Sequence, residues 1–574
     1  MKQTLLLALS CHFLLASYAQ PPTFSWVKTI TFPNTSSIAE VFDFCADSAG
    51  NSYVYGFFIN SLNFGNGIFL QAQNAEEGYF VARYAPDGTL SWARKIVAPD
   101  GDFIFSGVNP GGISADNAGN AYISGQLSNP ALDFGGGVVL QRSCTGTTCS
   151  DLFVTKYNAA GDIQWIRQAA GSAGTFQTAT RLVTGTDGTL FVAGNYEGQT
   201  LTFDNMLTYN SLNINGMYLA RYTPAGTALG ATFFSNGSGL SQVEHLAVTR
   251  QNAVLATGSY YAESLEFGNG ISLEAFGDDG AANYFIVQYT AQGEAQWAYN
   301  LHSDSYLELL DVATDTAGQP YVVVDFTVNL FGGTDLIAVT PVAGDSTGIL
   351  LHLADSVFTP VVAVQYSGPV YPLANVTVDR NNRFFASGYF SNPPLAVDTA
   401  VIASKGCDDA LLLSGHTNVL PLNWVRAAGG AGCEAILSAY FGRTLATDQA
   451  GFLYTVGSFG GNLKLDGFIK TGNGLFVGKL ATGTVGLNDP ADTGLGFGIS
   501  PNPSRGDFQI TVGNLDAPVQ VLVYDTQGAI RHQRFLRQAD DLNFRLALPT
   551  GLYTVVLVQR NRLGRQKVLI INTP

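Results

Sequence analysis

The chain repeats one phrase seven times, and this repetition constrains the fold more than any other feature of the sequence. Each phrase is a polar turn that leads into a β-rich run ending in a small residue. The two clearest copies run from Asp47 to Gly56 and from Asp116 to Gly125, and weaker copies centre on Gly194, Gly258, Val324, Gly388 and Gly457. Successive centres are 69, 69, 64, 66, 64 and 69 residues apart. A repeat of that length suits four short strands, so the sequence predicts an all-β fold.

The first repeat can be divided into four strands, A to D, at residues 41–46, 52–58, 79–84 and 90–96. A hairpin at 62–70 lies between B and C, and a tight turn at 86–88 joins C to D. All five tryptophans of the chain fall in the D-strand slot: Trp26, Trp92, Trp165, Trp297 and Trp424. We interpret them as packing between adjacent sheets rather than as ligand-stacking groups.

Residues 24–30 form a D strand with no A, B or C strand before it. The last repeat has a C strand at 475–480, but its D strand breaks off at residues 488–490. Pairing the first strand with the last C strand would close a ring and protect two sheet edges. The sequence therefore predicts a seven-bladed β-propeller over residues 24–486, closed by the N-terminal strand. The fifth repeat is the least regular, because Val324 replaces glycine and its D strand has no tryptophan.

These repeats resemble the β-propeller repeats of secreted bacterial proteins, often called SBBP repeats. The resemblance covers residues 24–486; it is clearest in the first two repeats and weakest in the fifth. It implies the propeller fold and a role as an extracellular scaffold. It does not imply a particular ligand.

The N-terminus has the pattern of a secretory signal peptide over residues 1–19. Lys2 supplies the positive charge, residues 4–15 are apolar, and Ser17 and Ala19 are the small residues of a cleavage site after Ala19. A lipid attachment at Cys11 is the alternative. No later segment has the ~18 uninterrupted apolar residues of a membrane helix, so we expect no transmembrane segment. The predicted location is secreted or on the outer cell surface.

Residues 487–498 read as a linker, and residues 499–574 as a small β-sandwich with strands separated by glycine and proline turns. Its motifs are Pro501, Asn502 and Pro503 with Gly506; a turn containing Asp525 and Gly528; Gly551 and Tyr553; and a closing strand that contains Lys567. On these residues the segment resembles the C-terminal sorting domain of type IX secretion in Bacteroidota. The resemblance implies the type IX secretion machinery as a partner, removal of the domain, and release or surface attachment. The Arg505-Gly506-Asp507 tripeptide is explained by the turn and not by adhesion.

Charge is distributed unevenly along the chain, whose net charge is −16. Residues 499–574 contain nine Lys and Arg against five Asp and Glu. The whole chain contains 28 Lys and Arg and 44 Asp and Glu. Residues 1–498 therefore contain 19 Lys and Arg against 39 Asp and Glu, which is a net charge of −20. A strongly acidic body disfavours nucleic acid as a partner, since binding of phosphates requires basic groups. The change of sign also marks a domain boundary.

Cysteine use fits an oxidising compartment. Cys144 with Cys149 and Cys407 with Cys433 are the candidate disulfides, while Cys45 is predicted to be a buried thiol. The histidines are scattered and no catalytic motif is present. We therefore predict no catalytic, cofactor-binding or metal-ligating residue. The Asp-x-x-Gly phrases are interpreted as turns, and calcium is the one cofactor that they leave open.

The A–B and C–D turns are short, whereas the B–C hairpins and D–A connections are long and emerge together on one face. That face should carry the acidic pairs Glu76-Glu77, Asp278-Asp279 and Asp408-Asp409, and long loops on a rigid scaffold are where function usually lies. We expect a non-enzymatic binding or adhesion scaffold for a glycan or protein ligand there. The alternatives are a polysaccharide lyase or glycosidase with a site at the propeller mouth, and a structural surface or biofilm component. Two or more carboxylates with an Arg or Tyr in the central funnel would favour the enzyme.

Overall fold

The computed structural model describes most of the chain after residue 20 and contains no helix within the residues it describes. The described residues are 21–72, 77–99, 111–145, 149–171, 175–204, 207–210, 215–234, 241–276, 282–339, 346–354, 356–366, 370–391, 394–397, 400–405, 408–416, 419–429, 433–435, 442–481, 497–512, 519–524, 530–536, 543–546, 548–559 and 562–571. Over these ranges, nothing helical is long and apolar enough to cross a membrane. The chain divides into two compact units after Thr482.

Within the described ranges of the larger unit, seven groups of four antiparallel strands follow one another along the chain, and we number these four-stranded units as sheets 1 to 7. Their first strands are β2 (Ile38–Ala46), β8 (Ile113–Ala115), β14 (Arg181–Thr184), β20 (Gln242–Val248), β26 (Leu307–Thr314), β32 (Tyr371–Val378) and β39 (Leu445–Thr447). Their second strands are β3 (Ser52–Ile59), β9 (Ala121–Leu127), β15 (Leu190–Glu197), β21 (Val254–Tyr260), β27 (Pro320–Phe326), β33 (Arg383–Ser391) and β40 (Leu453–Gly460).

The remaining strands complete the sheets. The third strands are β6 (Glu77–Tyr84), β12 (Asp151–Tyr157), β18 (Asn215–Tyr222), β24 (Asn283–Tyr289), β30 (Ser346–Ala354), β36 (Asp408–His416) and β43 (Gly474–Leu480). The fourth strands are β7 (Leu90–Val97), β13 (Ile163–Gly171), β19 (Ala228–Phe234), β25 (Ala295–Ser303), β31 (Val357–Tyr366), β37 (Val419–Ala428) and, for sheet 7, β1 (Phe24–Thr31). The short strand β38 (Cys433–Ala435) also pairs with β40.

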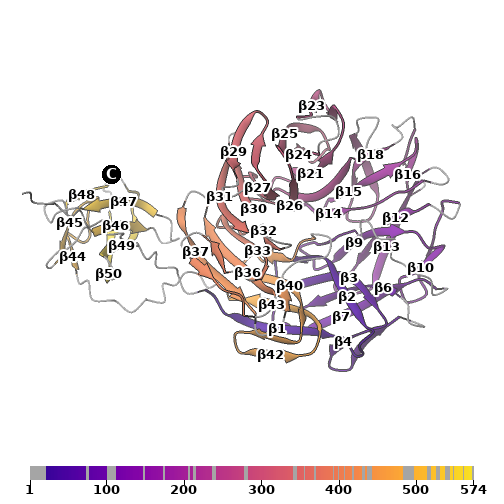
Figure 1. Cartoon of the computed structure of the whole chain (residues 1–574), viewed down its shortest axis with the longest axis horizontal. Coiled ribbons are helices and arrows are strands. Elements are labelled where there is room, and N and C mark those ends of the chain that lie inside the picture. Colours follow the sequence, from indigo (N-terminus) through magenta and orange to yellow (C-terminus); the bar gives the residue numbers. More distant parts are fainter. Residues whose placement is uncertain are drawn as a thin grey trace, which may run out of the picture. The chain divides into compact units, whose positions relative to one another are not determined.

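The first strands of the seven sheets contact one another in an unbroken cycle. Each packs against the first strand of the next sheet, and β39 packs against β2. Figure 1 shows the sheets arranged around a common centre. Side chains tie neighbouring sheets together there: Asp43 accepts the amide of Ile113 at 2.8 Å, and Asp311 accepts the amide of Val376 at 2.9 Å.

The N-terminal strand completes the last sheet, as predicted. In β1, Thr29 lies opposite Phe476 and Trp26 opposite Lys479 of β43. A second tie joins the two ends of the larger unit, since Arg443 pairs with Asp43 at 2.6 Å. Closure therefore combines a strand ladder with a buried ion pair between residues that lie 400 positions apart.

A β-bulge in the first strand explains the recurrent glycine. The pairing of β2, β20 and β26 with their second strands skips one residue just before a buried polar side chain. The bulged backbone comes so close that a Cβ on Gly56 would lie 2.2 Å from the carbonyl of Glu40, and one on Gly258 would lie 2.0 Å from that of Gln242. Only glycine fits where the carbonyl is this close, as at Gly56 and Gly258. In sheet 5 the same bulge lies opposite the fully buried Val324, so the bulge by itself does not exclude a side chain.

Seven B–C hairpins lie in the described residues, and four of them extend the preceding sheet, which the sequence did not reveal. The seven are β4–β5 (Ser61–Gly65, Ile68–Gln71), β10–β11 (Ala131–Asp133, Val139–Gln141), β16–β17 (Leu201–Phe203, Leu207–Tyr209), β22–β23 (Ser264–Gly268, Ile271–Glu274), β28–β29 (Asn329–Gly332, Asp335–Val339), β34–β35 (Leu395–Val397, Ala400–Ile402) and β41–β42 (Asn462–Leu465, Phe468–Thr471). Four of them pair with a neighbouring fourth strand: β4 with β1, β10 with β7, β16 with β13, and β28 with β25. Leu62 of the β4–β5 hairpin is fully buried. These four hairpins therefore cover the edges of the sheets before them.

The smaller unit contains two antiparallel sheets in its described residues. One is formed by β44 (Phe497–Ser500), β45 (Asp507–Val512) and β48 (Asn543–Arg545), and the other by β46 (Val519–Tyr524), β47 (Ile530–Leu536), β49 (Gly551–Gln559) and β50 (Arg562–Ile570). Phe508, Val523, Phe544 and Val568 are part of one buried apolar cluster between them.

Candidate functional site

Tyrosines and carboxylates gather at the D–A end of sheets 5 and 6. Tyr306 precedes β26, and Glu308 is the second residue of that strand. The hydroxyls of Tyr306 and Tyr371 both donate to Oε2 of Glu308, the latter at 3.4 Å. Deeper in the cluster, the Tyr366 hydroxyl donates to Oδ2 of Asp325 at 2.5 Å. All five residues lie where A strands begin or where B and D strands end, so the fold brings them to one face.

The two carboxylates are direct partners across the β26–β27 ladder. The register pairs Glu308 with Asp325, and side chains opposite each other in an antiparallel pair have Cβ atoms about 5 Å apart. Glu308 is partly exposed, whereas Asp325 is only 2% exposed. Burial raises the pKa of Asp325 to about 6, and the neighbouring Glu308 adds to this effect.

Sheet 4 adds a third carboxylate on the same side. Oε1 of Glu244 accepts hydrogen bonds from Ser259 at 2.8 Å and from Gln242 at 3.0 Å. Burial raises the pKa of Glu244 to about 7, with a further contribution from Glu308. Tyr284 of β24 is near both carboxylates, since burial and then the charges of Glu244 and Glu308 raise the pKa of its phenol. We call Glu244, Tyr284, Tyr306, Glu308, Asp325, Tyr366 and Tyr371 the mouth cluster.

A second group of charges lies along the axis. Arg443 pairs with Asp43 and also donates to the carbonyl of Ile113 at 2.5 Å. Burial raises the pKa of Asp311 to about 7, against hydrogen bonds from two backbone amides. Burial lowers the pKa of His245, which faces Asp311 at 3.9 Å. These contacts connect sheets 1, 2, 4, 5 and 7, so we assign this group to the framework.

The tryptophans contact the following sheet. Trp26, Trp92 and Trp165 donate their indole N–H to the carbonyls of Pro86, Ala159 and Pro224, at 2.9, 3.1 and 3.1 Å. Each ring also covers a positive-φ glycine of that turn, for example Gly161 beneath Trp92. Trp297 and Trp424 lie in the same slot of sheets 4 and 6 and pack against buried apolar residues.

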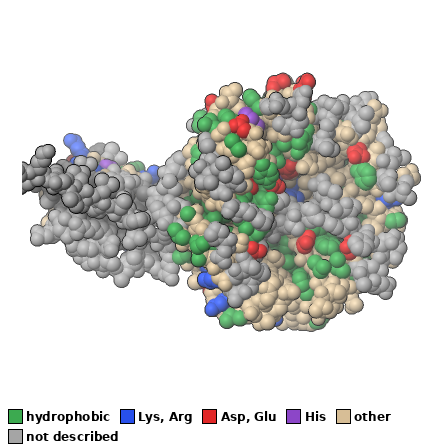
Figure 2. Space-filling model, viewed as in Figure 1, with side chains coloured by type: hydrophobic (Ala, Val, Ile, Leu, Met, Phe, Trp, Pro, Cys, Tyr) green, Lys and Arg blue, Asp and Glu red, His purple; other side chains and the backbone are tan. Residues whose placement is uncertain are grey.

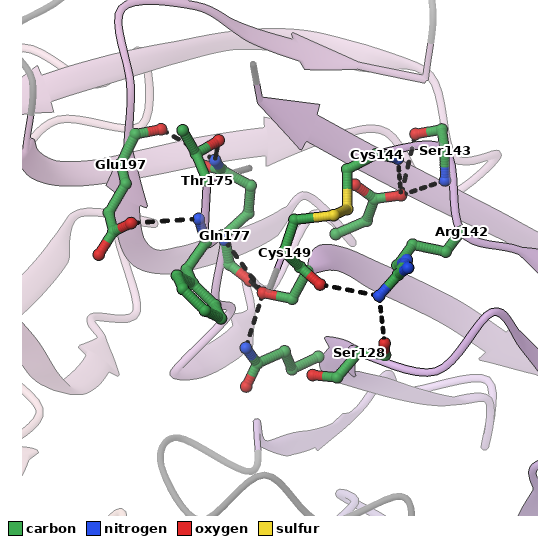
Figure 3. Close-up of a disulfide and its surroundings, with 12 residues drawn as sticks. Ser128, Arg142, Ser143, Cys144, Cys149, Thr175, Gln177 and Glu197 are labelled. Carbon is green, nitrogen blue, oxygen red and sulfur yellow. Dashed lines mark hydrogen bonds between the residues drawn. A yellow bond between two sulfur atoms is a disulfide. The ribbon is translucent and has the colours of Figure 1, made fainter. Parts of the chain in front are cut away.

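One of the two predicted disulfides is present in the described residues, between Cys144 and Cys149. Figure 3 shows Arg142 beside it, donating to the carbonyls of Ser128 and Cys149. Cys407 lies outside the described residues, so the second pairing with Cys433 stays a prediction. Cys45 is a free, buried thiol, as expected.

The predicted sorting motifs lie close together in the smaller unit. The Asn502 side chain donates to the carbonyl of Lys567 at 2.6 Å and accepts the amide of Leu569 at 2.9 Å. The flanking Pro501 and Pro503 follow cis peptide bonds. A Cβ on Gly506 would lie 2.2 Å from the carbonyl of Leu546.

Two further motif residues are placed in β49, and two are not. Tyr553 donates to the carbonyl of Pro549 at 3.0 Å, and Gly551 is the first residue of that strand. Asp525 and Gly528 lie outside the described residues.

The aspartates of the A–B turns use their oxygens within the turn. Oδ1 of Asp47 accepts the amides of Ala49 and Asn51, and Oδ2 accepts from Asn51 and Tyr53 at 2.7 and 2.9 Å. Asp116 repeats the pattern. In the described part of the chain, no three His, Cys, Asp or Glu side chains are grouped as metal ligands.

Of the acidic pairs expected on the working face, the structure describes Glu77, Asp408 and Asp409, and none of these three belongs to the mouth cluster. Asp409 is fully buried and accepts the amide of Lys405; Glu77 is 3% exposed. Glu76 and the pair Asp278-Asp279 lie outside the described residues. The mouth cluster was missed because its members are single residues in several repeats. The one available signal was the irregularity of the fifth repeat, which supplies four of its seven members.

Comparisons with known proteins identify no family, because no family model matches the chain. A protein of Acanthamoeba polyphaga mimivirus, described as an uncharacterized WD repeat-containing protein L264, is 24% identical over 360 residues. The match covers 54% of this chain and 26% of the viral protein, so the chain spans about a quarter of that relative.

Three solved structures illustrate how remote the structural likenesses are. An ulvan lyase of polysaccharide lyase family PL25 has a TM-score of 0.37 at 9% identity, covering 76% of this chain and 93% of that one. A protein of unknown function from Dyadobacter fermentans has a TM-score of 0.32 at 10% identity, and the match covers 79% of this chain and 98% of that one. PorZ, a surface component of the type IX secretion system of Porphyromonas gingivalis, has a TM-score of 0.17 at 12% identity, and the match covers 95% of this chain and 100% of that one. At these scores the likenesses carry no weight for function.

Proposed function

We propose that the larger unit is a seven-bladed β-propeller that acts outside the cell as a non-enzymatic binding scaffold for glycans. The Cys144–Cys149 disulfide supports an oxidising, extracellular location. The signal-like residues 1–19 support export. We propose further that residues 499–574 are a type IX sorting domain, supported by the contact of Asn502 with the strand that contains Lys567.

The observation that carries the binding proposal is the environment of Glu308. Two tyrosine hydroxyls hold Oε2, while Oε1 has no hydrogen-bond partner among the described residues. The carboxylate is partly exposed and lies beside the exposed ring of Tyr306. A free carboxylate oxygen accepts sugar hydroxyls strongly, and an aromatic face packs against the apolar face of a sugar ring.

A glycan and polysaccharide array on the purified protein tests this proposal. Glu308→Gln should weaken glycan binding by about tenfold, because a charge-assisted hydrogen bond is replaced by a neutral one. Glu266→Gln is the matched control, since Glu266 is exposed on the β22 hairpin, outside the mouth cluster. Absence of any bound glycan, or equal binding by both variants, would refute the proposal.

A glycosidase is the second candidate, because the mouth cluster combines carboxylates with tyrosines, the combination expected above for an enzyme, and because Glu308 and Asp325 form a close pair. Closely spaced carboxyl groups are the machinery of glycoside hydrolysis, and a pKa of about 6 suits a proton donor. The 2% exposure of Asp325 argues against direct contact with substrate. Product release in the same array, abolished by Asp325→Asn, would establish the enzyme and displace the scaffold.

A further inference from the structure

The pairing of Glu308 with Asp325 costs stability, and the equivalent pair of residues in sheet 4 has no such cost. At the corresponding register of sheet 4, Gln242 lies opposite Ser259, so neutral groups face each other. In sheet 5 two carboxylates do. Like charges directly opposite in a ladder are destabilising. Sheet 5 therefore holds an electrostatic repulsion that the fold itself does not require.

No cation of the described residues neutralises this pair. The ion pairs among those residues involve other carboxylates, such as Asp43 with Arg443 and Asp379 with Arg383. The hydroxyls of Tyr306 and Tyr371 supply hydrogen bonds to Glu308 but no positive charge. The nearby cation of the described residues, Arg181, acts on Glu244, so the negative charge of the Glu308–Asp325 pair is left to an external group.

Asp325 supplies an independent sign of a missing partner. It is 98% buried, yet its Oδ1 atom has no hydrogen-bond partner among the described residues. Its carboxyl group faces the cluster, since Tyr366 donates to the other oxygen and Glu308 acts on its charge. A buried acceptor without a donor is costly. A positive charge above it would compensate part of that cost.

Aromatic rings line the same place. Tyr306 is 40% exposed and Tyr261, at the end of sheet 4's second strand, is 43% exposed. Tyr371 lies 6.4 Å from Tyr389, measured between ring centroids. Exposed aromatic faces beside carboxylates are the usual surroundings of a bound ammonium group.

We infer that the sugar bound at the mouth cluster carries a protonated amine, so that the ligand class is an amino sugar or its polymer. This inference rests on the proposed glycan-binding function and specifies its ligand. The ammonium group would lie between Glu308 and the tyrosine rings and would be attracted by Asp325 beneath. A neutral sugar leaves the repulsion in place, and a uronic acid increases it.

The net negative charge of residues 1–498 also favours a positively charged ligand. Residues 1–498 have a net charge of −20, and Figure 2 shows acidic side chains at several places on the described surface of the larger unit. A long-range negative potential raises the association rate of a polycation and lowers that of a polyanion.

The test compares oligosaccharides that differ only at the amine. A β-1,4-linked glucosamine hexamer, its fully N-acetylated counterpart, cellohexaose and hexalysine are titrated into the full protein at pH 6 by calorimetry. The glucosamine hexamer should bind at least about tenfold more tightly than the N-acetylated one, as expected for an ion pair with cation–π contact. Glu308→Gln should remove that preference, and Glu266→Gln should retain it.

Each other result has a distinct meaning. Equal binding of the acetylated or neutral hexamer overturns the amine inference but leaves the glycan-binding proposal intact. Binding of hexalysine alone overturns both, and indicates a basic peptide as the ligand. Retention of the amine preference in Glu308→Gln overturns the assignment to the mouth cluster. A circular-dichroism melt of each variant verifies that the fold is unchanged.

Discussion

The two residue types that recur along the chain serve different contacts, the glycine within its own sheet and the tryptophan with the next sheet. The recurrent glycine is needed because a bulged first strand brings a carbonyl onto it, and the D-strand tryptophan is needed because it covers a turn of the next sheet. Both residue types had been read from the repeat pattern. The distance between two strands of one sheet explains the glycine, and the contact with the next sheet explains the tryptophan.

The glycine contact can be tested with alanine. Gly258→Ala would place a Cβ 2.0 Å from the carbonyl of Gln242, so the strand must shift, and we expect a loss of about 3 kcal/mol in the free energy of unfolding. Gly348→Ala is the control, because its nearest neighbour is Leu373 at 3.5 Å. Urea unfolding followed by fluorescence measures both. Similar losses in the two variants would contradict the close-approach explanation.

The indole contact can be tested with phenylalanine. Trp92→Phe removes the hydrogen bond to Ala159, and we expect a loss of about 1–2 kcal/mol. In sheet 4, Trp297 has no hydrogen bond from its indole among the described residues, so Trp297→Phe should cost less. Thermal melts of both variants provide the comparison. If Trp297→Phe is the more destabilising, the hydrogen bond is not the main contribution.

At the level of elements, the N-terminal strand and the outer hairpins have the same task. β1 supplies the fourth strand of sheet 7, and four of the hairpins cover the edges of preceding sheets. Both protect backbone groups that would otherwise form unpaired edges. The hairpin at 62–70 belongs to this framework, so its removal would test folding rather than ligand binding.

The role of β1 can be tested by removal and replacement. A variant that lacks residues 21–31 exposes β43, so we expect a lower melting temperature and loss of hydrogen-exchange protection in β43. A synthetic peptide of residues 21–31 should restore both, and a scrambled peptide should not. A truncated protein that melts like the full one would show that closure does not depend on this strand.

At the level of the whole molecule, three carboxyl groups with strongly raised pKa values lie near the axis and at the mouth cluster. Asp311, Glu244 and Asp325 are carboxyl groups whose pKa values burial raises to about 7, 7 and 6. Their protonated forms are therefore favoured by folding. Asp311 and Asp325 lie in the fifth repeat, which is the least regular one. Departures from a regular sequence pattern are expected at functional sites.

This distribution predicts the pH dependence of stability. Because Asp311 binds its proton more tightly when folded, its stabilising contribution is complete below about pH 4 and is lost as pH rises to about 7. In Asp311→Asn, the fall in melting temperature between pH 5 and pH 7.5 should be smaller than in the parent. Glu266→Asn, at an exposed site, should leave the slope unchanged. Identical slopes in the parent and Asp311→Asn would contradict the raised pKa.

The sequence alone determined the all-β class, the four strands of each repeat and the pairing of residues 24–30 with residues 475–480, because these depend on local periodicity and on one strand left without a sheet. It also identified the Cys144–Cys149 bridge, where a short loop joins the two cysteines. Only the tertiary structure decided that Glu308 meets Asp325 and Tyr371, or that each of four hairpins extends the sheet before it. Such contacts depend on register, bulges and the placement of one sheet against the next, and none of these is encoded in the pattern of a single repeat.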